Sequence, residues 1–201
     1  MKKYHVKLIF TETLLGTVAK DREVYSTFIA GKVALTDEAI AEELATVEEM
    51  EEKGWTGFHT LNGGPVLYDY AVKGFFKDAC SMLRRSEEKN LSKALTAFRK
   101  IIDGMIFVKP RQIPLVLPPG VAMGVLERPL RGQTAQGERI SLARSDTCPA
   151  GTMMEFDIIV LGGVTEKHLR EWLDYGRFRG LGQWRSASYG RFTFHMEQLE
   201  E

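Results

Sequence analysis

Hydrophobic and polar residues alternate in three segments of the chain, residues 5–10, 153–161 and 192–196. In each segment every second side chain is apolar, so one face is hydrophobic and the other is mixed or polar. A period of two predicts half-buried β-strands, one at the start of the chain and two in its last quarter. Their inward positions are Val6, Leu8, Phe10, Met154, Phe156, Ile158, Val160, Phe192, Phe194 and Met196.

Helical periodicity appears between the first and second of these strands, and again between the second and third. A first helix starts near Tyr68, and its broad buried face consists of Val72, Phe75, Phe76, Ala79, Met82 and Leu83. A second helix is predicted over residues 91–103, ending near Gly104. A third follows the candidate N-cap Thr165 and stops at Gly176, since serine or threonine favours helix starts and glycine favours helix ends.

Two segments interrupt this pattern and are interpreted as insertions. Residues 36–54 predict a surface helix, because residues 37–53 hold eight acidic side chains and one lysine around a narrow apolar stripe. Residues 105–150 contain most of the prolines and predict short strands and loops. Within them we expect a β-hairpin with its tip at residues 132–137.

The order of elements predicts an α+β fold of the ferredoxin-like, or RRM-like, βαββαβ type. We expect one domain over residues 1–201 that carries the two insertions. In the usual strand order, the first strand lies between the third and the last. Lys7 would then lie between the acidic pair Glu155 and Asp157 on one side and Arg191 on the other, an arrangement in which cross-strand charges compensate one another.

Composition limits the function classes. The chain has 201 residues, of which 44% are hydrophobic, enough for one sizeable core. It has no run of about 18 apolar residues, so we expect no membrane span. Its two cysteines do not imply a disulfide scaffold, which favours a reducing cytoplasm. The net charge is zero, but residues 176–191 hold four arginines and no acid, so a basic face is predicted despite the neutral total.

The usual signatures of enzymes are missing. No Walker-type loop, HExxH, CxxC or GxSxG motif occurs, and the histidines lack metal-ligand spacing, so we expect neither metal nor cofactor. His59 is the weak catalytic candidate. It lies in "GWTGFHTLNGGP", whose glycine and asparagine content predicts a loop. A loop histidine near basic side chains can act as acid or base on the 2′-hydroxyl of RNA.

The stretch "GLGQWRSASYGRFTF", residues 180–194, is the richest in candidate chemistry. Glycines permit positive φ and close approach of a ligand, and successive backbone N–H groups can form an anion-binding nest. Arginine matches phosphate geometry, and Trp184 and Tyr189 offer flat surfaces for stacking bases. These features favour a site for single-stranded nucleic acid. The alternative is a tight loop at the start of a strand with solvated arginines.

Three segments resemble the RAMP superfamily, the repeat-associated RNA-binding proteins of CRISPR effector complexes. They are "VKLIFTETLLGTVAKD" with its Leu15–Gly16 pair, "PVLYDYAVKGFFKDACSMLRR" with its Lys73–Gly74 pair, and "FRGLGQWRSASYGRFTF". They occur in the family's order. The chain departs from the family at Lys77 and Asp78, where a basic position is shifted or replaced, and at Gln183 and Trp184, where a second glycine is usual.

The resemblance implies an RNA-binding subunit of a ribonucleoprotein used in antiviral defence, with single-stranded guide RNA and other subunits, or further copies of this chain, as partners. It implies RNA contacts from the first helix and from the glycine-rich loop converging beside one groove, with weaker candidates on the hairpin. The helix and loop candidates are Lys73, Lys77, Arg177, Arg179, Gly180, Gly182, Arg185 and Arg191. The hairpin candidates are Arg128, Arg131 and Arg139.

Two other functions stay open at this point. Some relatives in the superfamily are metal-independent endoribonucleases, a role in which His59 would be the acid or base. Alternatively, the chain is a structural or assembly protein of a mobile element, with the acidic helix at residues 37–52 as its partner surface.

Overall fold

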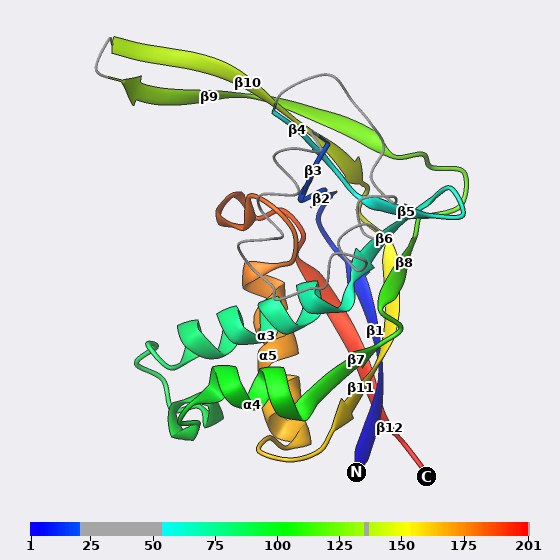
Figure 1. Ribbon diagram of the computed structural model, residues 1–201, viewed down its shortest axis with the longest axis vertical. Coiled ribbons are helices and arrows are strands. Elements are labelled where there is room, and N and C mark those ends of the chain that lie inside the picture. Colours follow the sequence, from blue (N-terminus) through cyan, green and yellow to red (C-terminus); the bar gives the residue numbers. More distant parts are fainter. Residues whose placement is uncertain (21–53, 135–136, 201) are drawn as a thin grey trace, which may run out of the picture.

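The computed structural model describes residues 1–20, 54–134 and 137–200. The acidic helix predicted over residues 36–54 lies outside the described residues, apart from Gly54. Within the described chain, two β-sheets and three α-helices form a mixed α+β fold, as the sequence predicts. The helices lie on one side of the larger sheet, and a long hairpin extends away from it (Figure 1).

The larger sheet is antiparallel throughout. Its strand order is β12-β1-β11-β8-β6-β5, and β7 also pairs with β11, beside β8. The bounds of these strands are Lys2–Phe10 for β1, His59–Leu61 for β5, Gly64–Tyr68 for β6, Ile106–Lys109 for β7, Gln112–Val116 for β8, Met153–Val160 for β11 and Phe192–Leu199 for β12.

The position of β1 between β11 and β12 confirms the predicted neighbours of the first strand. Lys7 lies opposite Glu155, and its Nζ is 2.9 Å from the Glu155 carboxylate. On the other side, Lys7 lies opposite His195, so the expected partner Arg191 is wrong. Arg191 precedes β12 and pairs its carbonyl with Thr11, beyond the end of β1.

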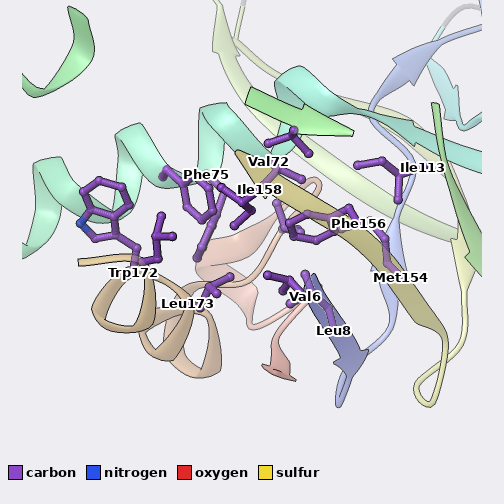
Figure 2. Close-up of a cluster of buried hydrophobic side chains, with 14 of the residues drawn as sticks. Val6, Leu8, Val72, Phe75, Ile113, Met154, Phe156, Ile158, Trp172 and Leu173 are labelled. Carbon is purple, nitrogen blue, oxygen red and sulfur yellow. The ribbon is translucent and has the colours of Figure 1, made fainter. Parts of the chain in front are cut away.

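Helices α3 (Asp69–Leu83) and α5 (Glu166–Arg179) pack their apolar faces against the larger sheet (Figure 2). Phe75 from α3 and Trp172 from α5 are buried in this core, where the Trp172 indole N–H donates to the Ser92 hydroxyl at 2.9 Å. Thr165 caps α5 together with His168, as predicted for the N-terminus. Truncating a buried aromatic side chain to alanine typically costs about 3–5 kcal/mol, so this layer carries much of the stability.

The helix predicted over residues 91–103 is split, so its continuous extent was wrong. A 3₁₀ turn, η1 (Leu91–Ala94), is followed by α4 (Phe98–Met105). Ala97 between them has a left-handed backbone with φ of 50°, which breaks the helical path. The helix ends at Met105, one residue beyond Gly104, as predicted, and the chain continues directly into β7.

The smaller sheet has the order β2-β10-β4-β3, with β9 also paired to β10. Its strands are β2 (Leu14–Leu15), β3 (Val18–Ala19), β4 (Trp55–Gly57), β9 (Gly124–Thr134) and β10 (Gly137–Cys148). The long β9–β10 pair is the hairpin predicted with its tip at residues 132–137. It projects beyond the helices at the top of Figure 1.

The loop predicted around "GWTGFHTLNGGP" is largely strand, so that prediction was wrong. Residues 54–68 form β4, β5 and β6, and the last two are joined by a two-residue turn. Both turn residues, Asn62 and Gly63, have positive φ, the conformation that asparagine and glycine adopt at least cost. The glycines and asparagine therefore mark a hairpin turn, and the histidine nearby belongs to a strand.

Both cysteines are free and buried. Burial raises the pKa of the Cys148 thiol to about 12, so this side chain is inert at neutral pH. Among the helices in the described parts of the chain, none is sufficiently long and apolar to cross a bilayer.

Candidate nucleic-acid interface

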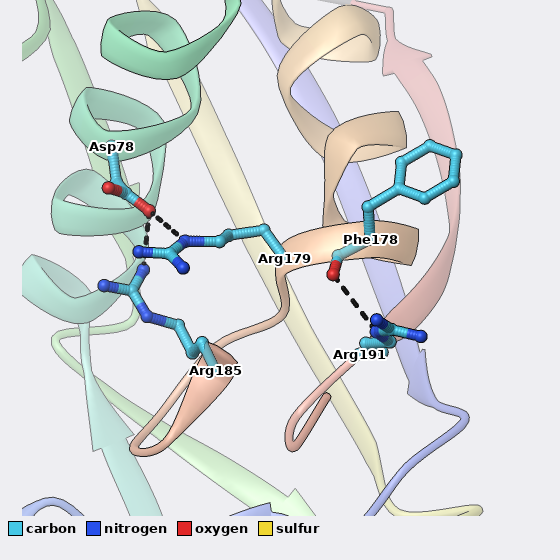
Figure 3. Close-up of polar contacts among 5 residues, drawn as sticks. All are labelled: Asp78, Phe178, Arg179, Arg185 and Arg191. Atoms are coloured by element: carbon cyan, nitrogen blue, oxygen red, sulfur yellow. Dashed lines mark hydrogen bonds and ion pairs between the residues drawn. The ribbon is translucent and has the colours of Figure 1, made fainter. Parts of the chain in front are cut away.

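Of the four arginines in residues 176–191, two meet at one carboxylate of helix α3 (Figure 3). Arg179 Nε lies 3.0 Å and Arg185 Nη1 lies 2.8 Å from the same oxygen, Oδ2 of Asp78. Between a fifth and a third of each of these side chains is exposed. Two guanidinium groups and one carboxylate leave a net charge of one positive unit, so the cluster Arg179–Asp78–Arg185 stays cationic.

The glycines bring the two arginines together by allowing the loop to fold closely on itself. Helix α5 continues past Gly176, so the predicted stop there was wrong, and it ends at Arg179, followed by Gly180 with φ of 75°. The N–H of Leu181 donates to the Gly190 carbonyl at 2.8 Å. A Cβ on Gly190 would collide with the Leu181 carbonyl oxygen, and one on Gly182 would approach the Leu15 carbonyl oxygen to 2.8 Å. Only glycine fits these close approaches.

The predicted anion-binding nest is not available at the amides just described. The N–H of Leu181 is used by Gly190, and the N–H of Gly190 donates to the Thr13 carbonyl at 2.8 Å. The N–H of Gly180 completes the last turn of α5 by bonding to the Gly176 carbonyl. These amides hold the loop in place, so positive charge near the loop comes from side chains.

The two aromatic rings of the loop stack on each other. The ring centroids of Trp184 and Tyr189 are 5.3 Å apart with planes 12° from parallel. Arg128 of β9 places its Cζ 4.3 Å from the Trp184 ring centroid. Trp184 contacts both neighbours, yet 41% of its surface stays exposed, so its use as a stacking surface for bases stays a prediction.

Gln183 and Trp184, the pair that departs from the family pattern, attach the loop to the hairpin. The Gln183 side-chain oxygen accepts hydrogen bonds from Arg128 at 3.3 Å and from Ser145 of β10 at 3.2 Å. With the cation–π contact of Arg128, these bonds fix the base of the hairpin relative to the loop. The orientation of β9 and β10 is therefore coupled to the glycine-rich segment.

The other two arginines of residues 176–191, Arg177 and Arg191, have different partners. Arg177 forms an exposed ion pair with Asp174 one helical turn earlier, at 2.8 Å. Arg191 donates from Nε to the carbonyl of Phe178 at 3.1 Å, at the C-terminal end of α5 (Figure 3). Carbonyls at a helix C-terminus carry partial negative charge, so this position suits a cation.

The lysines of α3 contact a different element from the loop arginines. Lys77 Nζ lies 2.8 Å from the Asp103 carboxylate, and Lys73 Nζ donates to the Asp103 carbonyl at 3.1 Å. Both therefore hold α4 against α3, whereas Asp78 on the same helix faces the loop. The helix lysines and the loop arginines thus have different partners, Asp103 and Asp78, and their convergence on one RNA groove stays a prediction.

His59 lies in β5 with only 2% of its surface exposed, and packs edge-on against Tyr68 at 4.6 Å between ring centroids. Burial lowers its pKa to about 4, so the imidazole is neutral at physiological pH. The expectation of a loop histidine was therefore wrong. A side chain that is so deeply buried cannot reach the 2′-hydroxyl of a bound RNA to exchange a proton with it.

The other hairpin candidates lie on the two paired strands. Arg131 of β9 is opposite Ile140, and Arg139 of β10 is opposite Gly132, close to the tip. Both lie nearer the tip than Arg128, which is in the middle of β9 and contacts the loop through Gln183.

No protein-family model and no curated protein sequence matches the chain. Among solved structures, a chain of the cryo-EM structure of the Type III-B Cmr-beta bound to cognate target RNA is similar over 99% of this chain, with a TM-score of 0.56 and 13% identity. This chain covers 61% of that one, or about three fifths of its length. A chain of a Type IV-B CRISPR complex has a TM-score of 0.48 and 12% identity. The match covers 97% of this chain and 90% of that one. At such identities the likeness concerns the fold.

Proposed function

We propose that this chain is an RNA-binding subunit of a CRISPR-type ribonucleoprotein, built as one RAMP-like domain. The element order β1, α3, β7, β11, α5, β12 supports a ferredoxin-like core with insertions, because β1 lies between β11 and β12 and β7 lies outside β11. The similar fold of a chain from Cmr-beta, which is bound to target RNA, supports the ligand class. The subunit would act in the cytoplasm with protein partners and single-stranded RNA.

The observation that carries the proposal is the Arg179–Asp78–Arg185 cluster beside the glycine-rich loop. A guanidinium group has five N–H donors, and each of these two arginines uses one of them on Asp78. The other donors and the net positive charge suit the phosphates of a nucleic-acid backbone. The cluster would therefore bind RNA through charge and geometry, with little dependence on base sequence.

The site favours binding over catalysis. His59, the one histidine considered for acid–base chemistry, is buried and has a pKa of about 4. General acid–base catalysis works best with an accessible group whose pKa is near the working pH. We therefore propose a non-catalytic subunit, in which Lys73 and Lys77 serve the packing of α4 rather than the RNA.

The proposal is tested by fluorescence anisotropy with a labelled single-stranded RNA. Binding is measured between about 50 and 200 mM salt, because affinity that depends on phosphate contacts falls steeply over this range. Two double variants each remove two positive charges: R179Q/R185Q at the loop and K73Q/K77Q at α4. The loop variant is expected to weaken binding by about tenfold or more, and to flatten the log–log salt slope by up to about 1.4, or about 0.7 for each phosphate that the protein no longer neutralises.

The lysine variant is the matched control for charge, and is expected to weaken binding by less than about threefold, through long-range attraction alone. Thermal unfolding of each variant checks that the fold is retained. Equal losses of affinity in the two variants would show that only total charge matters, and a larger loss in the lysine variant would move the site to α3 and α4. Absence of salt-sensitive binding by the unmodified protein at micromolar concentration would refute RNA binding itself.

A further inference from the structure

Phe178, on the last turn of α5, exposes 65% of its surface although it adjoins residues that are tied into the fold. Its neighbour Arg179 turns toward Asp78 on α3. In Figure 3 the Phe178 ring points away from that cluster, toward the side on which β12 lies, whereas the Phe178 carbonyl faces Arg191, just before β12. The C-terminal end of α5 thus presents arginines on one side and a bare aromatic ring on another.

Two further arginines lie near Phe178, one at its ring and one at its carbonyl. Arg177 Cζ lies 6.0 Å from the ring centroid, and Arg191 Nε is bonded to the carbonyl of Phe178 itself. Arg177 is neutralised by its ion pair with Asp174. Arg191 is held by a carbonyl instead, and this one hydrogen bond uses one of its five N–H donors. The positive charge near Phe178 therefore comes chiefly from Arg191, which lies at the carbonyl of that residue.

We propose that Phe178 and Arg191 form a nucleotide-binding subsite, in which a nucleobase stacks on the Phe178 ring and its phosphate binds the Arg191 guanidinium. This inference rests on the proposed function and names one of its contacts. An exposed aromatic ring stacks on any base, and a nearby guanidinium matches phosphate geometry. A single exposed ring with arginines nearby suits an anionic nucleotide better than the apolar surface of a protein partner.

The subsite and the Arg179–Asp78–Arg185 cluster lie at the same end of α5. Both are attached to the C-terminal end of α5, and the glycine-rich loop connects Arg179 to Arg191. The loop is closed by the Leu181–Gly190 hydrogen bond, which fixes Arg191 relative to the end of the helix. An RNA strand that crosses this loop would thus meet a phosphate-binding cluster and a base-stacking ring in succession.

The test compares F178L, which keeps the residue apolar but removes the aromatic face, with F178W, which enlarges it. Affinity is measured for a single-stranded RNA and for an oligonucleotide of the same length with abasic positions, which retains the phosphates. F107L is the matched control, because Phe107 is also an exposed phenylalanine beneath a cation, with Lys73 Nζ at 5.2 Å, but lies next to α4.

We expect F178L to weaken binding to the base-bearing RNA by about fivefold or more, and to leave binding to the abasic oligonucleotide unchanged. F178W and F107L should bind like the unmodified protein or, for F178W, more tightly. The subsite is refuted if F178L binds RNA normally, or if its affinity falls equally for both oligonucleotides. Normal RNA binding with reduced self-association in sedimentation would assign the ring to a protein contact instead. If the unmodified protein fails to bind RNA, the proposed function fails as well.

Discussion

Replacing Asp78 by asparagine tests the cluster on which the interface depends. D78N keeps the shape of the side chain but removes the negative charge that accepts hydrogen bonds from Arg179 at 3.0 Å and from Arg185 at 2.8 Å. A hydrogen bond to a charged group contributes about 1.5–3 kcal/mol when buried, and much less when exposed. With between a fifth and a third of these side chains exposed, we expect D78N to lose about 1–2 kcal/mol of unfolding free energy in total.

Urea unfolding measures this loss, and thermal unfolding should show a Tm lower by about 3–6 °C in a chain of this size. D174N is the control, because it also removes one acid that pairs with an arginine of the same segment. The Asp174–Arg177 pair is about half exposed, so its removal should cost less than about 0.5 kcal/mol. In RNA binding, D78N adds one positive unit at the loop, so the log–log salt slope should become steeper by up to about 0.7.

The reasoning is refuted if D78N is no less stable than D174N, since the two arginines would then gain nothing from the shared carboxylate. An unchanged salt slope in D78N would show that the added charge lies away from the RNA.

Two other features of the chain give measurable predictions. Burial lowers the pKa of His59 from 6.5 to about 4, so as the pH falls the unfolded chain binds a proton before the folded chain does. The free energy of unfolding should therefore drop by about 3 kcal/mol between pH 6.5 and pH 4. Urea unfolding at several pH values should show this component in the unmodified protein and lose it in H59N, and the same pH dependence in both would contradict the assignment. G190A should destabilise the fold by about 2 kcal/mol, because Gly190 has a φ of +70° and a Cβ there would collide with the Leu181 carbonyl. G74A should stabilise the fold by about 0.5–1 kcal/mol, because Gly74 lies inside α3 with open space around it. If thermal unfolding gives the two variants the same Tm, this account of the loop is contradicted.

The sheet and the main helices could be predicted because their signals are local. Alternation in residues 5–10 and 192–196 indicates one buried face for each strand, and the apolar spacing after Tyr68 indicates the inner face of α3. The pairing of Lys7 with Glu155 followed from the strand order alone. The β5–β6 turn was missed although Asn62–Gly63 is a strong hairpin signal, because the surrounding glycines suggested a loop.

The site was harder to predict because its partners are far apart in sequence. The glycine-rich segment and its arginines were visible, but Asp78 lies 101 residues before Arg179. Nothing local to Asp78 indicates that it faces the loop while Lys77, next to it, faces α4. Similarly, the exposure of Phe178 depends on how α5 ends against the sheet, which periodicity alone does not give.

Photo-crosslinking of a 4-thiouridine-containing single-stranded RNA, followed by mass spectrometry, tests the central claim most directly. The account predicts crosslinks concentrated in the end of α5 and the glycine-rich loop, residues 177–191, which carry Arg179, Arg185 and Phe178. Crosslinks confined to α4 and β7, residues 98–109, would contradict it.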